Sequence, residues 1–149
     1  ETRGNTKLFI VGATGWMVEE LLKDLAADDS VRFLGHVDDN ELASLLTGAR
    51  ALLYPSLYEG FGLPVVEAMQ LGVPVLTANI GATQEIAEGA ALLVDPLSVE
   101  DIRAGMTRLL MEPDLIAQLS LAGPHRARSF SWEHTARTTV QTLEKLAGR

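Results

Sequence analysis

The sequence contains no cysteine among its 149 residues, so disulfide bonds and thiol chemistry are excluded. This absence fits a reducing, cytosolic compartment. Basic residues are also scarce, because 12 Lys and Arg stand against 20 Asp and Glu and give a formal net charge of −8. The charge argues against nucleic acid as a partner, since phosphate binding depends on clustered cations. No apolar run approaches the roughly 20 residues that a membrane-spanning helix needs.

The sequence does contain enough apolar material for one folded domain. Hydrophobic residues make up 47% of the chain and charged residues 21%, which is typical of globular proteins. A chain of 149 residues is long enough to bury a sizeable core. We therefore treat residues 1–149 as a single domain, whose part from about residue 98 onward is helical.

Short runs of adjacent apolar residues predict β-strands. The apolar residues are neighbours instead of alternating with polar ones, which is typical of strands covered on both faces. The runs lie at residues 7–12, 31–35, 49–55, 73–78 and 90–95. Segments with helical spacing lie between them, at residues 16–26, 40–47, 63–71 and 82–87. This alternation predicts an α/β fold, a three-layer Rossmann-like parallel sheet with helices on both faces.

The last third of the chain predicts three helices in succession. Ser98 precedes the first, with Asp101 three residues later, close to a capping box. Pro113 permits a break before a second helix, and Ser131 is expected to cap a third. The third helix has an apolar stripe, formed by Trp132, Ala136, Val140 and Leu143. We interpret the stripe as a packed face, because the helix lacks the strongly basic side of a membrane-surface helix.

One stretch, PSLYEGFGLPVVEAM at residues 55–69, carries the main functional signal. It follows an expected strand, and a helix is expected to begin near Leu63, with Pro64 suited to its first turn. Ligands bind beyond the carboxyl ends of parallel strands, and amides at a helix start attract phosphate. Glu59 and Glu67 flank this turn and could accept hydrogen bonds from vicinal hydroxyls. The spacing fits a nucleotide sugar, but it fits two ordinary surface carboxylates equally well.

Longer segments make the pattern specific. The run YPSLYEGFGLPVVEAMQLGVPVLTANIGATQEIAEGAALLVDP resembles the retaining glycosyltransferases of family 4, as do KLFIVGATGW, VRFLGHVDDNELASLLTGA and SFSWEHTA. The likeness covers nearly the whole chain and is strongest to the mannosyltransferase-like branch. It implies the C-terminal, donor-binding half of a GT-B fold. It also implies a nucleotide diphosphate sugar as donor, with no metal or other cofactor.

The resemblance implies roles for the residues around the turn. Glu59 would be catalytic, contacting the hydroxyls of the donor sugar. Phe61 and Gly62 would offer backbone amides to the same sugar. Leu63 would donate its amide to the distal phosphate at the helix start, and Glu67 would accept from the ribose hydroxyls.

Further donor contacts are implied nearer the beginning of the chain. Gly12 would border the diphosphate, and His36 and Val37 would meet the nucleobase mainly through their backbone. One position departs from the family pattern, because Gln84 stands before Glu85 where many relatives have proline. This departure puts a ligand role for Glu85 in doubt.

Cations are missing where a diphosphate would need them. No Lys or Arg occurs from Ala51 through Ile102, the window that contains Glu59 and Glu67. One helix start cannot offset a diphosphate that lies beside two carboxylates. Family members supply an Arg and a Lys upstream of the strand matched by residues 7–12. We therefore expect that the first strand and helix of the donor domain, and the whole N-terminal acceptor domain, are missing, so that this chain alone is inactive.

Together these features predict the donor-binding half of a retaining hexosyltransferase in polysaccharide biosynthesis. It would move mannose from GDP-mannose, or glucose from a UDP-glucose type of donor, to a hydroxyl acceptor. We expect the parent in the cytoplasm, with peripheral association at the cytosolic membrane face. Two alternatives stay open: a glucosyltransferase similar to glycogen or sucrose synthase, and a non-catalytic module of the same fold that binds a nucleotide or a protein.

Overall fold

The computed structural model describes residues 6–13, 25 and 28–148. The chain divides into two compact units, Glu1–Ser44 (unit 1) and Leu45–Arg149 (unit 2). The helix expected at residues 16–26 lies outside the described residues except at Leu25.

Unit 1 contains two parallel strands, β1 (Leu8–Val11) and β2 (Val31–Gly35). Both were predicted from their apolar runs. Their side chains remain largely exposed, however, with Phe9 49% and Phe33 39% exposed. Whether both faces of these strands are covered stays a prediction, because the helix expected between them lies outside the described residues. Helix α2 (Asp39–Gly48) follows β2 and crosses the boundary between the units.

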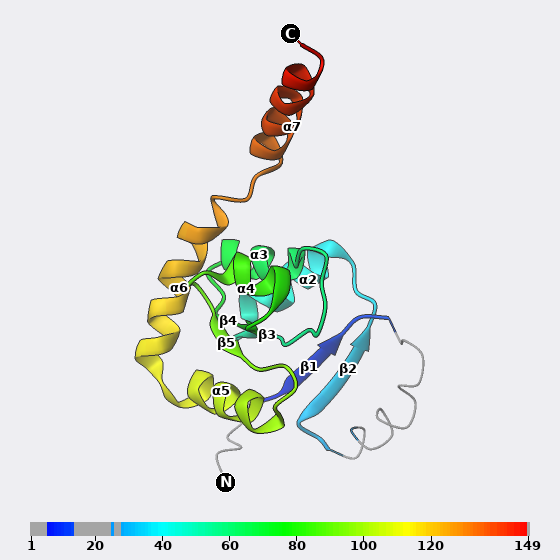
Figure 1. Ribbon diagram of the computed structural model, residues 1–149. Coiled ribbons are helices and arrows are strands. Elements are labelled where there is room, and N and C mark those ends of the chain that lie inside the picture. Colours follow the sequence, from blue (N-terminus) through cyan, green and yellow to red (C-terminus); the bar gives the residue numbers. More distant parts are fainter. Residues whose placement is uncertain (1–5, 14–24, 26–27, 149) are drawn as a thin grey trace. The chain divides into compact units, whose positions relative to one another are not determined.

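Unit 2 is built on a parallel sheet with helices on both faces, as the sequence predicted. Helices α3 and α4 lie on one face and α5 on the other (Figure 1). The middle strand, β4, is buried at every residue, which explains its unbroken apolar run. The strands, in their order across the sheet, are β3 (Leu52–Tyr54), β4 (Val75–Ala78) and β5 (Leu92–Val94). The first helices are α3 (Leu63–Gln70), α4 (Gly81–Ala87) and α5 (Val99–Met111).

The core of unit 2 lies between the sheet and the helices that follow it. Its buried cluster consists of Leu76, Val94, Leu109 and Leu119. Helix α6 (Pro113–Ala127) packs along α3, and Gly123 makes this possible. A Cβ atom at Gly123 would lie 3.2 Å from the carbonyl oxygen of Met69 on α3. The close approach brings the C-terminal end of α6 to the face of the sheet that carries α3 and α4.

The helix starts predicted at Ser98 and Ser131 are confirmed. The Ser98 hydroxyl accepts a hydrogen bond from the Asp101 amide at 3.1 Å. The Asp101 carboxylate accepts from the Asp95 amide at 2.7 Å, so the capping box is only half formed. Ser131 caps α7 (Trp132–Leu146) through the His134 amide, also at 3.1 Å.

Helix α7 differs from the prediction in its surroundings. The apolar stripe was interpreted as a packed face, yet Trp132 is 80% exposed, Val140 52% and Leu143 59%. That interpretation is wrong for this chain, since no residue of α7 is buried. None of the helices among the described residues is long and apolar enough to cross a membrane.

Candidate functional site

The residues that the sequence singled out around 55–69 lie where strands β3 and β4 end. Strand β3 ends at Tyr54, and the loop of residues 55–62 leads into α3. Strand β4 ends at Ala78, and two residues separate it from the start of α4 at Gly81. Both connections start at the carboxyl edge of one parallel sheet, which is where open α/β sheets bind ligands.

Gly62 begins α3 in a conformation that favours glycine. Its φ is +111° and its ψ is +50°, outside the regions that other residues readily adopt. A Cβ atom there would lie 3.4 Å from the Cγ2 of Thr83 and 3.6 Å from the Cδ1 of Ile86, both on α4. The glycine thus sets the start of α3 directly against α4.

The first turn of α3 has few amides to offer a ligand. Pro64 carries no N–H, and the amides of Val65 and Val66 donate to the Gly62 carbonyl at 3.0 and 3.4 Å. The Leu63 amide is at the first helical position and has no acceptor among the described residues. The Leu63 amide is thus open to a ligand, and its role as the donor at this helix start stays a prediction.

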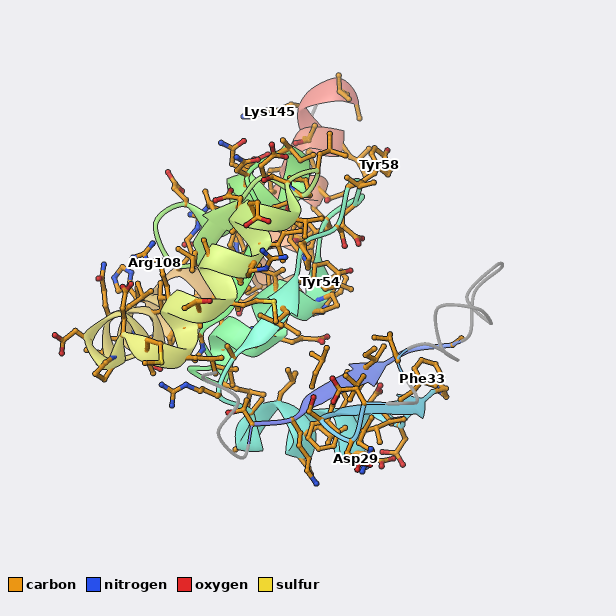
Figure 2. The ribbon with its side chains drawn as sticks, turned by 90° about the horizontal axis from the view of Figure 1, so that it is seen from below. Asp29, Phe33, Tyr54, Tyr58, Arg108 and Lys145 are labelled. Atoms are coloured by element: carbon orange, nitrogen blue, oxygen red, sulfur yellow. The ribbon has the colours of Figure 1, made fainter. Side chains whose placement is uncertain are left out.

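The Glu59 carboxylate is fixed by a tyrosine. Its Oε1 accepts a hydrogen bond from the Tyr54 hydroxyl at 2.7 Å, and the side chain is half-buried. Burial, and then the hydrogen bond and negative charge of Glu59, raise the pKa of Tyr54 to about 12. Tyr54 is held in turn, because its carbonyl accepts from the hydroxyl of the fully buried Thr77 at 2.9 Å. Figure 2 shows Tyr54 against the body of unit 2, whereas Tyr58 projects outward.

Glu67 lies on the exposed side of α3, one turn after Leu63. Residues four apart on a helix share a face, so the Glu67 carboxylate lies on the same side of α3 as Leu63. Among the ion pairs of the described residues, none involves Glu59 or Glu67. Both carboxylates are therefore free of cationic partners within the described structure.

Phe61 is anchored by an aromatic residue that the sequence interpretation did not identify. The rings of Phe61 and Phe130 meet edge to face, with centroids 5.7 Å apart and planes at 82°. The Arg126 guanidinium lies over the Phe130 ring, 4.8 Å from its centroid. The segment after α6 thus stabilises the loop that carries Glu59.

Arg126 also holds the C-terminal end of α4. Its guanidinium donates to the carbonyls of Ile86 at 2.9 Å and Glu85 at 2.8 Å. It also forms an ion pair with Glu88 at 2.8 Å. A cation bound to the last carbonyls of a helix satisfies acceptors that the helix leaves open. Because these partners lie about 40 residues earlier in the chain, no local signal in the sequence could have revealed them.

The site residues predicted in unit 1 also lie together. The Gly12 amide donates to the Gly35 carbonyl at 2.8 Å, so Gly12 lies beside the turn that follows β2. His36 is exposed and Val37 half-buried in that turn. All three lie at the carboxyl edge of the β1–β2 ladder, and their roles as donor contacts stay predictions.

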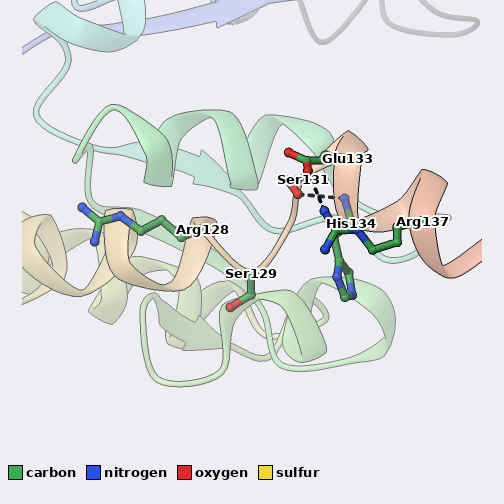
Figure 3. A pocket seen from close by; sticks show the side chains of 6 residues that line it. All are labelled: Arg128, Ser129, Ser131, Glu133, His134 and Arg137. Carbon is green, nitrogen blue, oxygen red and sulfur yellow. Dashed lines mark hydrogen bonds and ion pairs between the residues drawn. The ribbon is translucent and has the colours of Figure 1, made fainter.

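A cavity of about 500 Å³ lies elsewhere, at the junction of α6 and α7 (Figure 3). Its lining includes none of the predicted site residues and consists of Arg128, Ser129, Ser131, Glu133, His134 and Arg137. Arg137 pairs with Glu133 at 2.7 Å, while Arg128 points away from both (Figure 3). Across residues 6–13, 25 and 28–148, no group of three or more His, Asp or Glu side chains could hold a metal ion.

The sequence is similar to those of known proteins. The family described as "Glycosyl transferases group 1" matches residues 1–126. The chain is 35% identical over 149 residues to the O-antigen chain mannosyltransferase B of Escherichia coli, covering 98% of this chain and 39% of that protein. It is 40% identical over 135 residues to the MMP alpha-(1->4)-mannosyltransferase of Mycolicibacterium hassiacum, covering 88% of this chain and 33% of that protein.

The solved structures extend the comparison to the fold. The sucrose-phosphate synthase of Thermosynechococcus elongatus superimposes with a TM-score of 0.82 at 29% identity, over 95% of this chain and 39% of that chain. The chain thus spans about two-fifths or less of the relatives described. The match confirms the predicted α/β architecture as the C-terminal part of a GT-B glycosyltransferase. The chain belongs to the glycosyl transferases group 1 family.

Proposed function

We propose that this chain binds the nucleotide-sugar donor of a retaining hexosyltransferase, with mannose as the favoured sugar. The observation that carries the proposal is the turn at the end of β3. It combines the half-buried carboxylate of Glu59, the positive φ of Gly62 and the open amide of Leu63, and α3 then exposes Glu67. The two mannosyltransferases that the chain resembles support mannose.

Each group suits a different part of the donor. The Leu63 amide, aided by the partial positive charge of the helix start, would meet the distal phosphate. Carboxylates repel phosphate but accept hydrogen bonds from neighbouring hydroxyls, so Glu59 would bind the sugar and Glu67 the ribose. Such charge-assisted bonds contribute on the order of 1.5–3 kcal/mol each.

Transfer would keep the anomeric configuration of the sugar. The leaving diphosphate assists on the face from which the acceptor hydroxyl arrives, and the sugar passes through an oxocarbenium-like state, as in glycoside hydrolysis. Glu59 then stabilises the sugar electrostatically and does not act as a nucleophile. The start of α3 stabilises the charge that develops on the diphosphate.

The reaction also needs an acceptor site, which we assign to a separate acceptor-binding domain. The coverage of 39% and 33% of the two mannosyltransferases supports a division of labour between parts of a longer enzyme. On this proposal the chain alone transfers no sugar and binds nucleotide diphosphates weakly, with a Kd on the order of 1 mM. Peripheral association of the parent with the cytosolic membrane face stays a prediction.

Glucose from a UDP-linked donor is the second candidate. The likeness to a sucrose-phosphate synthase, at 29% identity over 95% of the chain, favours it. The carboxylate of Glu59 could accept from the hydroxyls of either hexose, so the site chemistry does not separate the two sugars.

A saturation-transfer NMR screen of the chain tests the proposal. GDP-mannose, UDP-glucose, GDP and UDP are compared, and at least one nucleotide sugar is expected to bind. Glu67→Gln should weaken the binding of nucleotides and of nucleotide sugars alike, because on this proposal Glu67 binds the ribose that both share. Glu144→Gln, an exposed glutamate on α7, is the matched control and should change nothing. A wild-type chain that binds none of the four ligands would contradict the proposal.

A further inference from the structure

We propose that Tyr54 is a positioning residue that orients the Glu59 carboxylate toward the donor sugar. The inference rests on the proposed function. In this role Tyr54 does not contact the substrate and acts through the Glu59 carboxylate, which does.

Tyr54 is held in the sheet, whereas its hydrogen-bond partner Glu59 lies in a loop. Tyr54 is the last residue of β3 and pairs with Thr77 in the ladder to β4. The Thr77 hydroxyl donates to the Tyr54 carbonyl at 2.9 Å, so the backbone of Tyr54 is held by a fully buried side chain. Glu59, in contrast, lies in the loop of residues 55–62. The bond between them therefore ties a loop side chain to the sheet.

The bond itself is short and charge-assisted. The Tyr54 hydroxyl and the Glu59 Oε1 are 2.7 Å apart, in the range of O–H···O⁻ bonds. A tyrosine hydroxyl is protonated near neutral pH in any case, and burial and the neighbouring carboxylate raise the pKa of Tyr54 further, to about 12, so the hydroxyl is the donor. Glu59 is thereby the acceptor in this pair.

This arrangement prepares Glu59 for a ligand before the ligand arrives. A free glutamate side chain loses rotamer entropy when it is ordered. Tyr54 orders one carboxylate oxygen, and Oε2 has no hydrogen bond among the described residues. Oε2 can then accept from a sugar hydroxyl without that entropy being lost again on binding.

The test compares two tyrosines in the 149-residue chain. Tyr54→Phe removes only the hydroxyl, and Tyr58→Phe is the matched control because Tyr58 is 89% exposed. Dissociation constants are measured by NMR titration for UDP-glucose and GDP-mannose, and for UDP and GDP alone. For the nucleotide sugar that the wild type binds, we expect Tyr54→Phe to raise the dissociation constant by about fivefold. The dissociation constant of the corresponding free nucleotide should stay unchanged. Tyr58→Phe should change neither.

A double-mutant cycle links the effect to Glu59. With Glu59→Gln already in place, Tyr54→Phe is expected to change sugar binding by less than about twofold. The amide spectrum and the urea midpoint of every variant establish that it is folded.

The remaining outcomes overturn the inference in different ways. Equal weakening of nucleotide and nucleotide sugar would mean that Tyr54 has only a structural role. Unchanged binding in Tyr54→Phe, with normal binding in the wild type, would remove the positioning role and leave the proposed function standing. A wild-type chain that binds no ligand would overturn the proposed function and this inference with it.

Discussion

The loop before α3 and the helix α7 are both marked by clear local signals in the sequence, but only the loop is fixed by distant residues. In the loop, Phe61 packs on Phe130 from beyond α6. Glu59 bonds to Tyr54, whose carbonyl is held in turn by Thr77 of β4. Helix α7 has a capping serine and an i,i+4 ion pair, yet none of its residues is buried. Local signals thus set where an element begins, whereas contacts from far along the chain set whether it can hold a site.

The largest expected effect comes from shortening a buried leucine, with an exposed leucine as the control. Leu76 on β4 is fully buried, and Leu143 on α7 is 59% exposed. Leu76→Ala is expected to lower the free energy of unfolding by about 2–5 kcal/mol, because it leaves a cavity. Leu143→Ala should change it by less than about 0.5 kcal/mol. Urea unfolding measures both, and a large loss in Leu143→Ala would mean that α7 is packed after all.

The second prediction concerns two glycines with positive φ. Gly62→Ala is expected to destabilise the chain by about 1–3 kcal/mol, because its φ of +111° is strained for alanine and Thr83 and Ile86 lie close. Gly148, at the end of α7, has a φ of +71°, and a Cβ atom there would meet nothing within 4 Å among the described residues. Gly148→Ala should cost less than about 1 kcal/mol, since a chain end can relax. Equal losses would show that the contacts at Gly62 contribute nothing.

The third prediction compares two arginines with ion pairs. Arg126→Gln is expected to cost about 1–2 kcal/mol, because it removes bonds to the carbonyls of Ile86 and Glu85 and the contact with Phe130. Arg137→Gln removes only an exposed pair with Glu133 and should cost less than about 0.5 kcal/mol. Hydrogen exchange adds a local measurement. Protection in α4 should fall in Arg126→Gln alone, and unchanged protection there would contradict the assigned role.

The smallest expected effect is a dependence on pH. The pKa of Tyr54 is raised to about 12, whereas an unfolded tyrosine titrates near 10. The folded state thus favours the protonated hydroxyl, and this contribution is complete below about pH 10 and is lost as the pH rises toward 12. The difference in unfolding free energy between wild type and Tyr54→Phe should shrink over that range. A difference that stays constant from pH 9 to pH 12 would contradict the assignment.

Much of the fold could be predicted from the sequence because its elements are locally encoded. The five apolar runs all contain strands, and the helices after Gly62, Ser98 and Ser131 begin where their turn and cap residues predict. The positions of Glu59, Gly62 and Leu63 at the carboxyl edge of the sheet follow from the same reasoning.

Two features could not be predicted, for a common physical reason. Arg126 bonds to carbonyls 40 and 41 residues earlier, and Phe130 contacts a loop still farther back. Such contacts depend on how α6 packs along α3, and no periodicity encodes them. The interpretation of the α7 stripe as a packed face was wrong for a different reason. Periodicity shows that a helix has an apolar face but not whether other residues cover that face.

The central claim is that the turn from Glu59 to Glu67 binds the activated sugar, and amide NMR tests it most directly. The chain is titrated with GDP-mannose and with UDP-glucose, and shifts are mapped onto the sequence. The account predicts that the largest shifts within unit 2 fall at Phe61, Gly62 and Leu63. Shifts confined to the α6–α7 cavity around His134 and Arg137, or no shifts at all, would contradict it.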